Sequence, residues 1–286
     1  MDGLTNAGFT FEITDTPAAG GAPGEVVILL HGFPEDRHCW DAVTPALAEA
    51  GYRVLAPDQR GYSPGARPTS RRAYTLSHLA SDVLALADAA GVDRFHLVGH
   101  DWGAAVVWYL AAHHPERIIS VAALSVPHPD AYLRSWVTSG QMLRSWYMMA
   151  FQLPLLPELA LAFRGGAGMR AALVHTGLDP VTADRHALRA AVREALRGPL
   201  NWYRAIPFGL GDRTGRIEPP TLFMWSDRDV FISRAGAELC GRFVNGPYRL
   251  EVLQGVSHWL PSEAPDRVAA SLVQHFAAAT NKSVEG

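Results

Sequence analysis

The sequence predicts an α/β protein in which a mostly parallel β-sheet is flanked by helices and carries an inserted helical cap. Over the first half of the chain, short apolar runs alternate with helical runs, as in a parallel sheet with connecting helices. Between residues 128 and 210 no strand signal occurs, and Trp, Tyr, Met, Leu and Ala recur at helical spacing. We therefore expect a core of residues 1–127 and 211–286 and a cap of residues 128–210.

Each predicted strand is a short run of apolar or β-branched residues. Residues 9–14 alternate apolar and polar side chains, which is typical of an antiparallel strand at the edge of a sheet. The strands that follow are more continuously apolar, which favours parallel strands buried on both faces. In chain order they are residues 25–30, 52–56, 95–98, 118–126, 221–225 and 248–253.

The predicted core helices lie between these runs. Gly51 and Gly91 each follow a helical stretch directly and are suited to end it. Residues 104–113 are rich in strong helix formers. The full set of predicted core helices is residues 40–50, 75–90, 104–113 and 264–279.

The composition restricts the classes of function. The chain has 286 residues, of which 48% are hydrophobic, enough for a large core. A net charge of −3 gives no electrostatic support for nucleic-acid binding. No apolar run can span a bilayer, the N-terminus lacks a signal-peptide pattern, and two cysteines, Cys39 and Cys240, suggest no disulfide framework. We expect a cytoplasmic monomer or homodimer without nucleic-acid or membrane partners.

The turn at residues 99–103, Gly-His-Asp-Trp-Gly, is the centre of the predicted site. It lies between the strand at 95–98 and the helix at 104–113, and has the pattern of a nucleophile elbow. Its glycines allow strand and helix backbones to approach closely. The residue presented at the top of the turn is Asp101. The alternative is a structural Asp that caps the following helix.

An aspartate at this position indicates a particular kind of substrate. A serine that attacked an sp³ carbon would form an ether, which water could not readily cleave. A carboxylate that attacks an sp³ carbon forms an ester, which water can hydrolyse at the carboxyl carbon of Asp101. Asp101 is ionised at neutral pH without a general base. The motif therefore favours epoxides or alkyl halides as substrates.

Hydrolysis of that ester needs a general base and a group that orients the base. His258 follows the last predicted strand and stands in the order nucleophile, acid, base. Asp229, after the strand at 221–225, is the favoured orienting acid. Asp227 is the weaker candidate, suited to a local turn or a pair with Arg228.

Two backbone amides are candidates for an oxyanion hole. Trp102 follows the nucleophile directly, and Phe33 lies in the loop after the strand at 25–30. Their N–H groups are expected to stabilise negative charge on a carboxyl oxygen of Asp101 during ester hydrolysis. The same loop can also be read simply as a tight turn held by Gly32 and Pro34.

Taken together, these motifs resemble the epoxide hydrolases of the α/β-hydrolase fold. The resemblance rests on His-Gly-Phe-Pro-Glu at residues 31–35, on the turn at residues 99–103, and on Asp229 and His258. It covers nearly the whole chain and implies an α/β-hydrolase fold with a cap. It also implies hydrolysis of a small apolar epoxide to a vicinal diol through an ester on Asp101. No metal-ligand spacing is present, and we expect no cofactor.

The resemblance also implies two tyrosines in the cap that hydrogen-bond the epoxide oxygen. One family segment is Asn-x-Tyr-Arg, and it matches Asn201-Trp202-Tyr203-Arg204. The other tyrosine stands four residues before a Phe-Gln pair, which matches Tyr147. A phenol with a pKa near 10 stays protonated at pH 7 and can donate to a developing alkoxide. The alternative for each is an aromatic residue packed inside the cap.

Other functions compatible with the fold remain open. Haloalkane dehalogenases use the same nucleophile but often carry Asn where this chain has Phe33, and fluoroacetate dehalogenases usually have Arg where it has Trp102. Neither group needs the two cap tyrosines. A non-catalytic binding member of the fold would need no hydrolytic base. Fold alone does not separate these functions.

We expect the substrate to bind in a mostly apolar pocket between core and cap. The residues predicted to line it are Trp102, Trp146, Met148, Met149, Phe151 and Leu178.

Overall fold

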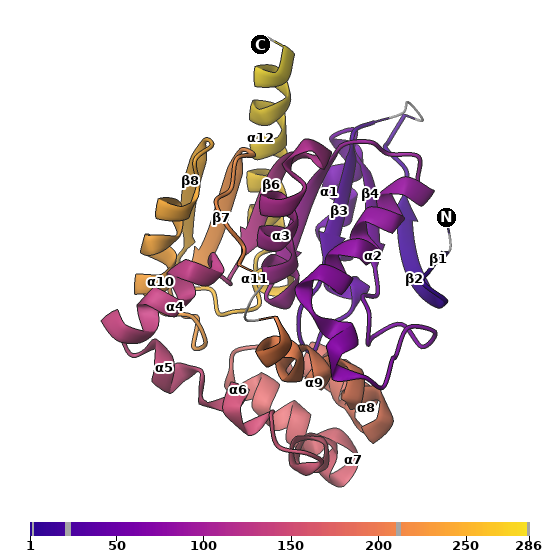
Figure 1. The fold of residues 1–286 in the computed structure, drawn as a ribbon, viewed down its shortest axis with the longest axis vertical. Coiled ribbons are helices and arrows are strands. Elements are labelled where there is room, and N and C mark those ends of the chain that lie inside the picture. The colour runs from indigo at the N-terminus through magenta and orange to yellow at the C-terminus, as the bar shows by residue number, and fades with distance from the viewer. Residues whose placement is uncertain (2, 21–23, 210–212, 285–286) are drawn as a thin grey trace.

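A twisted eight-stranded sheet forms the centre of the computed structural model, which describes residues 1, 3–20, 24–209 and 213–284 (Figure 1). The strand order is β1-β2-β4-β3-β5-β6-β7-β8. β2 pairs antiparallel with both β1 and β4, and the other neighbours pair in parallel. The strands are β1 (Gly3–Asn6), β2 (Phe9–Thr16), β3 (Val26–Leu30), β4 (Arg53–Pro57), β5 (Phe95–His100), β6 (Ile118–Leu124), β7 (Thr221–Ser226) and β8 (Tyr248–Leu253).

The two faces of the sheet bury separate hydrophobic clusters because side chains alternate along each strand. In β3, Ile28 and Leu30 join the cluster beneath α2 (Leu76–Ala89) and α3 (Trp102–His113). Val27 and Leu29 join the opposite cluster, beneath α1 (Thr44–Glu49) and α12 (Pro265–Val284). Burial of each such side chain contributes about 2 kcal/mol. β3 is buried on both faces, as its apolar run predicts.

The edge of the sheet and the first helix differ from the sequence-based prediction. β1 forms the edge, so the predicted edge strand β2 lies one position further in. β1 has only four residues and half of them are polar, too weak a pattern to predict. The predicted helix at 40–50 is instead a 3₁₀ turn, Arg37–Trp40, followed by α1. Pro45 fixes the start of α1 because proline favours the first helical turn.

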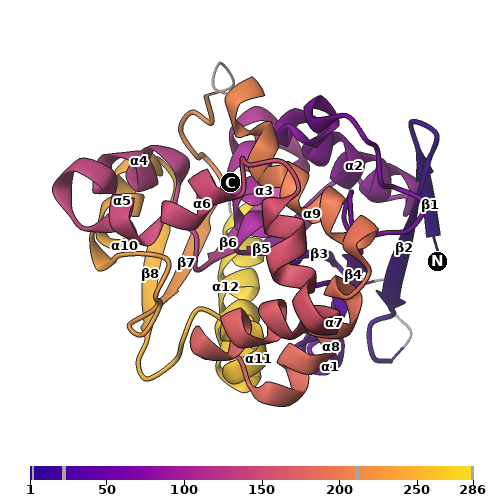
Figure 2. The ribbon, with the colours of Figure 1, turned by 90° about the horizontal axis from the view of Figure 1, so that it is seen from below.

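The segment between β6 and β7 is helical and covers the carboxyl edge of the sheet (Figures 1 and 2). Trp202 Nε1 donates to the carbonyl oxygen of Arg60 at 2.8 Å, and Arg189 pairs with Asp36, so both join this segment to the core. The predicted boundary between residues 210 and 211 lies outside the described residues. The helices are α4 (Pro129–Thr138), α5 (Gln141–Arg144), α6 (Trp146–Ala150), α7 (Leu156–His175), α8 (Pro180–Ala190) and α9 (Arg193–Ala205).

Two short helices complete the core. α10 (Arg234–Leu239) packs against α4, and α11 (Leu260–Glu263) leads into α12. Across the part of the chain that the structure describes, no helix is both long and apolar enough to cross a membrane.

Candidate active site

The strand-to-helix turn between β5 and α3 presents Asp101 at the base of a cavity. Asp101 has φ 52° and ψ −119°, a strained backbone conformation for a residue with a side chain. A Cβ atom on Gly99 would overlap the backbone of Gly103, and one on Gly103 would overlap the backbone of Leu30. The close approach therefore requires both glycines. The Asp101 side chain makes no capping hydrogen bond to α3, which argues against the helix-cap alternative.

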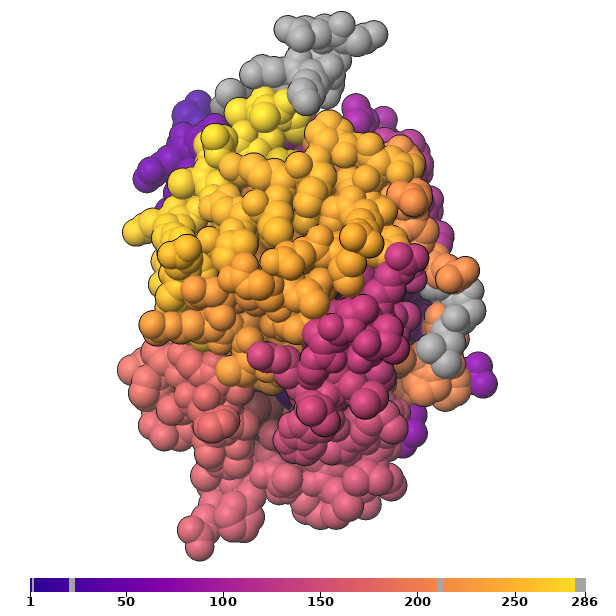
Figure 3. All heavy atoms as spheres, turned by 90° about the vertical axis from the view of Figure 1, so that its left-hand side faces the viewer, coloured from indigo at the N-terminus to yellow at the C-terminus, as the bar shows by residue number. Residues whose placement is uncertain are grey.

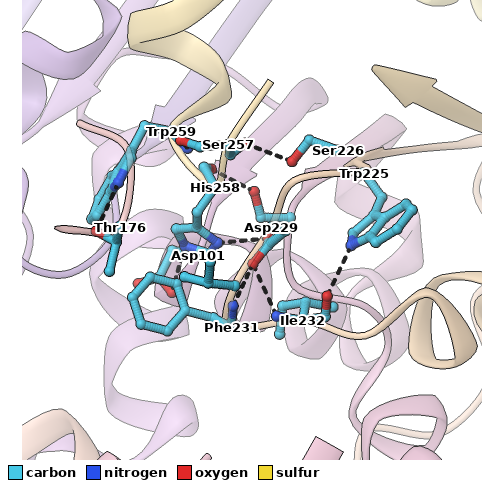
Figure 4. Close-up of polar contacts among 12 residues, drawn as sticks. Asp101, Thr176, Trp225, Ser226, Asp229, Phe231, Ile232, Ser257, His258 and Trp259 are labelled. Carbon is cyan, nitrogen blue, oxygen red and sulfur yellow. Dashed lines mark hydrogen bonds and ion pairs between the residues drawn. The ribbon is translucent and has the colours of Figure 1, made fainter. Parts of the chain in front are cut away.

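Three segments that are far apart in the sequence bring Asp101, Asp229 and His258 together (Figure 4). His258 donates from Nδ1 to Asp229 Oδ2 at 2.8 Å, and its Nε2 lies 3.4 Å from Asp101 Oδ2. Asp229 Oδ1 accepts hydrogen bonds from the amides of Phe231 at 2.7 Å and Ile232 at 2.9 Å. These amides fix the carboxylate, which in turn fixes the ring orientation of His258.

Asp227, the weaker candidate, lies outside this arrangement. Its side chain is exposed, and Oδ1 accepts from the amide of Gly255 at 2.8 Å, joining the loops that follow β7 and β8. Asp227 lies in a local turn, which the Asp229 N–H closes by donating to the Ser226 carbonyl oxygen at 3.2 Å, and its carboxylate joins two loops rather than pairing with Arg228.

The two carboxylates determine the charge of the histidine between them. Burial favours a neutral ring, but Asp229 and Asp101 outweigh burial and raise the pKa of His258 to about 10. Burial alone would raise the pKa of the Asp101 carboxyl, but the hydrogen bond and charge of His258 hold that pKa below its usual value. The free site therefore holds Asp101 as a carboxylate and His258 as an imidazolium at neutral pH.

One of the two backbone amides at the candidate oxyanion hole contacts this carboxylate directly. The N–H of Phe33 donates to Asp101 Oδ1 at 2.8 Å. A Cβ on Gly32 would overlap the Asp101 side chain, so the loop after β3 can approach only with glycine at this position. Trp102 is the first residue of α3, and its N–H has no acceptor within the helix.

Tyr147 on α6 and Tyr203 on α9 lie on the cap side of the same cavity. Their ring centroids are 6.0 Å apart. The ring of Tyr203 also packs edge-on against Phe33 and Trp102, at 5.4 and 5.1 Å. Burial, the neighbouring phenols and the charge of Asp101 raise the pKa of both tyrosines well above 10. Both phenols are therefore protonated hydrogen-bond donors at neutral pH.

The cavity between core and cap has a volume of about 620 Å³. Asp101 and His258 lie on its core side, and Phe231 and Trp259 complete that wall. Its other lining residues are mainly apolar and come from the cap, including Trp146, Phe151, Leu153, Leu156, Ala160, Leu161, Met169 and Leu173.

Four of the six predicted lining residues lie elsewhere. Met148 is turned toward Tyr132, whose hydroxyl donates to its Sδ at 3.2 Å. Met149 is 70% exposed on the outer surface of α6. Leu178 is buried in the cluster that packs the cap helices together. Trp102 packs edge-on against Trp202, at 5.8 Å between ring centroids, and not along the cavity wall.

The sequence reasoning missed two residues that contact His258, together with Glu35, which bonds one of them. Phe231 packs edge-on against His258 at 4.9 Å, and its place two residues after Asp229 could have indicated this position. His100 is fully buried and bonds through Nε2 to the backbone carbonyl of His258 and through Nδ1 to Glu35, both at 2.8 Å. No local pattern indicates these last two contacts, because they join residues distant in sequence.

Comparison with known proteins identifies the class. Residues 25–265 match the family model of the α/β hydrolase fold. The chain therefore belongs to the α/β-hydrolase fold family, with the fold that the motifs predict.

Relatives within this family narrow the class. Epoxide hydrolase A of Mycobacterium tuberculosis is 35% identical over 89% of this chain and 91% of its own length. Epoxide hydrolase 4 of Homo sapiens is 31% identical over 88% of this chain and 72% of its own length. The crystal structure of Epoxide Hydrolase A from Mycobacterium thermoresistibile has a TM-score of 0.81 and 28% identity, with 96% of each chain covered. Within the fold family, the chain belongs with the epoxide hydrolases.

Proposed function

We propose that this protein hydrolyses a small apolar epoxide to a vicinal diol through a covalent ester on Asp101. One observation carries the proposal. The carboxylate of Asp101 and the phenols of Tyr147 and Tyr203 line one apolar cavity from opposite sides. An epoxide between them can be attacked at carbon while its oxygen receives a hydrogen bond. In this proposal the helical segment at residues 128–210 acts as the cap that supplies the phenols.

Asp101 Oδ2 is the nucleophile in the first step. Oδ1 is already held by the Phe33 amide, whereas Oδ2 lies on the His258 side. Oδ2 forms a bond to one ring carbon as the bond from that carbon to the epoxide oxygen breaks. The oxygen keeps the electron pair and takes a proton from Tyr147 or Tyr203. The product is a 2-hydroxyalkyl ester whose carbonyl oxygen is Oδ1.

His258 acts as the base in the second step. Ester formation removes the negative charge of Asp101, so one of the two groups that raise the pKa of His258 is lost. The imidazolium then gives up its proton, which restores the tyrosine that protonated the epoxide oxygen, and neutral His258 can take a proton from a water molecule. That water attacks the carboxyl carbon, and the Phe33 and Trp102 amides stabilise the charge on Oδ1. The bond from the carboxyl carbon to the ester oxygen then breaks, and this oxygen takes a proton from His258. The remaining water proton passes from the Asp101 carboxyl to His258, so the diol leaves as the carboxylate and the imidazolium re-form.

Two probes separate this function from dehalogenation. The purified protein is incubated with styrene oxide or 1-bromobutane, with Asp101→Ala as the blank, and diol and halide are measured. We expect diol without halide. Halide without diol would show a dehalogenase in which both tyrosines are packing residues. Larger epoxides are also tested, in case styrene oxide does not fit the cavity. If no epoxide of this panel yields a diol, the proposal is rejected.

Removing the phenols is expected to slow ring opening specifically. Tyr147→Phe and Tyr203→Phe should each lower the single-turnover rate of ester formation by about 10- to 100-fold, and the double variant by more, because the alkoxide loses its proton donors. Rapid-quench measurement of epoxide consumption reports this step. Tyr132→Phe is the matched control, because its hydroxyl bonds Ser145 Oγ, at 2.5 Å, outside the cavity wall. An unchanged rate in the double variant would remove the tyrosines from the mechanism.

The two steps are expected to respond differently to pH. Ester formation should be flat from about pH 6 to about pH 9, because the pKa of Asp101 is lowered and those of both tyrosines are raised. Ester hydrolysis needs neutral His258, so its rate should fall about tenfold per pH unit below the histidine pKa in the ester. That pKa should lie below the value of about 10 in the free site. Single-turnover kinetics measures the rate of each step across this pH range. Identical pH profiles for ester formation and ester hydrolysis would contradict the assignment of His258 as the base of the second step.

A further inference from the structure

The cap exposes a group of large apolar side chains between residues 142 and 159. Each is between 48% and 76% exposed, although most residues of this kind are buried in the core. We call this group the rim patch. It consists of Met142, Leu143, Trp146, Met149, Leu153, Leu155, Leu156 and Leu159.

The rim patch surrounds the entrance to the substrate cavity. Half of its residues both line the cavity and are strongly exposed, namely Leu143, Trp146, Leu153 and Leu156. The space-filling view shows a hollow where the magenta and pink parts of the cap meet the orange core (Figure 3). α5, α6 and α7 lie at the lower end of the molecule, beyond the sheet, in Figure 1, and in front of the sheet in the view from below in Figure 2. An apolar surface therefore leads directly into an apolar cavity.

The extent of the rim patch marks it as an interaction surface. Each of its eight residues is about half or more exposed, and four of them meet at one cavity, whereas monomers rarely expose large apolar patches. A patch of this kind needs a partner or a surface that covers it.

The rim patch has two exposed arginines in or near it, Arg144 and Arg164. Residues 131–178 contain two further arginines, but Arg134 lies over the Phe243 ring and Arg170 is paired with Asp184 of α8 at 2.5 Å. The one acidic residue of this segment is Glu158, and Asp130 and Asp179 flank the segment. Glu158 is 5% exposed and is paired with Arg204, so it contributes little to the surface charge. The whole chain has a net charge of −3, so this basic segment departs from the rest of the molecule. Exposed apolar and cationic side chains together fit an anionic lipid surface.

A second copy of the chain fits this surface less well. A twofold dimer would place the rim patch against itself. Arg144 and Arg164 of both copies would then lie in or beside one interface, to which residues 131–178 supply no exposed carboxylate. The charge pattern therefore favours a negatively charged surface over self-association.

We propose that the rim patch docks the protein on an anionic lipid surface, with the cavity entrance facing the lipid. An apolar substrate dissolved in the lipid can then enter the cavity without crossing water. The proposal replaces the sequence-based expectation of no membrane partner with peripheral binding. It concerns binding alone, so it stands or falls separately from the proposed catalysis.

Vesicle binding tests the proposal directly. The full chain is mixed with sucrose-loaded vesicles of phosphatidylcholine and phosphatidylglycerol, or of phosphatidylcholine alone, and the pelleted fraction is measured. We expect binding to the anionic vesicles that weakens with salt. Arg144→Gln with Arg164→Gln should weaken it about 30-fold, since each basic residue near such a surface contributes about 1 kcal/mol. Met142→Ser with Met149→Ser should weaken it about tenfold or more through lost apolar burial.

The control is a pair of arginines at the opposite edge of the sheet. Arg94→Gln with Arg249→Gln gives the same net charge, and these residues lie at the amino ends of β5 and β8. This variant should bind like the unchanged protein. Equal loss in the control pair would show a non-specific charge effect and overturn the proposal. If the unchanged protein does not pellet with the vesicles, the proposal is overturned. If it also forms a dimer that Met142→Ser with Met149→Ser disrupts, the rim patch is a self-association surface.

Tryptophan fluorescence gives a second readout of the same contact. Lipids with brominated acyl chains quench tryptophans that enter the acyl region. We expect quenching in the unchanged protein, and we expect most of it to disappear in Trp146→Phe, which keeps an apolar ring at the rim patch. Undiminished quenching in this variant would mean that another face of the protein meets the lipid.

Discussion

Asp101→Ala is expected to lower diol formation by at least about 10⁴-fold, or about 5.5 kcal/mol of transition-state stabilisation. The proposed mechanism has no first step without the carboxylate, because the cavity wall offers no second carboxylate in its place. Steady-state assays with a reactive epoxide such as styrene oxide measure the loss. Substrate binding should persist, because the apolar wall and both phenols are retained.

A matched substitution separates this effect from damage to the fold. Asp227→Ala also removes a carboxylate after β7, but this side chain is exposed and, among the described residues, its carboxylate accepts only from the Gly255 amide. It should retain turnover within a few-fold. Thermal unfolding of both variants checks that each is folded. Retained diol formation in a folded Asp101→Ala protein would exclude the covalent route.

The fold and the reacting residues are predictable from sequence because their signals are local. Each of these signals spans only a few residues of sequence. Examples are the apolar run of β3, the glycines around Asp101, and the positions of Asp229 and His258 after β7 and β8. Parallel strands end at one edge of the sheet, so side chains that follow them meet there. The site can therefore be predicted by interpreting each segment separately.

The cavity wall is not predictable in the same way. Met148 and Phe151 are both apolar and lie on neighbouring turns of the cap, but only Phe151 lines the cavity. The rotation of a short helix depends on its tertiary neighbours, here the Tyr132 hydroxyl that contacts Met148. The exposure of the rim patch is not predictable from sequence either, because apolar residues in a cap are expected to be buried. The Glu35–His100 contact depends on the loop after β3 meeting the end of β5 in space.

His258→Gln is expected to separate the two chemical steps. Ester formation should continue, because the Phe33 amide still holds Oδ1 and both phenols are retained. Loss of His258 removes the group that lowers the pKa of the buried Asp101 carboxyl, so ester formation is measured on the alkaline side of neutrality, where the carboxylate is populated. Ester hydrolysis should slow by at least about 10³-fold, because glutamine cannot take a proton from water. The variant should consume about one equivalent of epoxide and then nearly stop. Mass spectrometry should find Asp101 heavier by the mass of the intact epoxide.

His38→Gln is the matched control, because His38 is exposed and bonds Asp41 away from the cavity. It should turn over normally and accumulate no adduct. The result in His258→Gln discriminates between two mechanisms that share every residue of this site. In the covalent mechanism the base acts only on the ester, so the adduct accumulates. If His258 instead activated water to attack the epoxide directly, its loss would stop epoxide consumption and leave Asp101 unmodified.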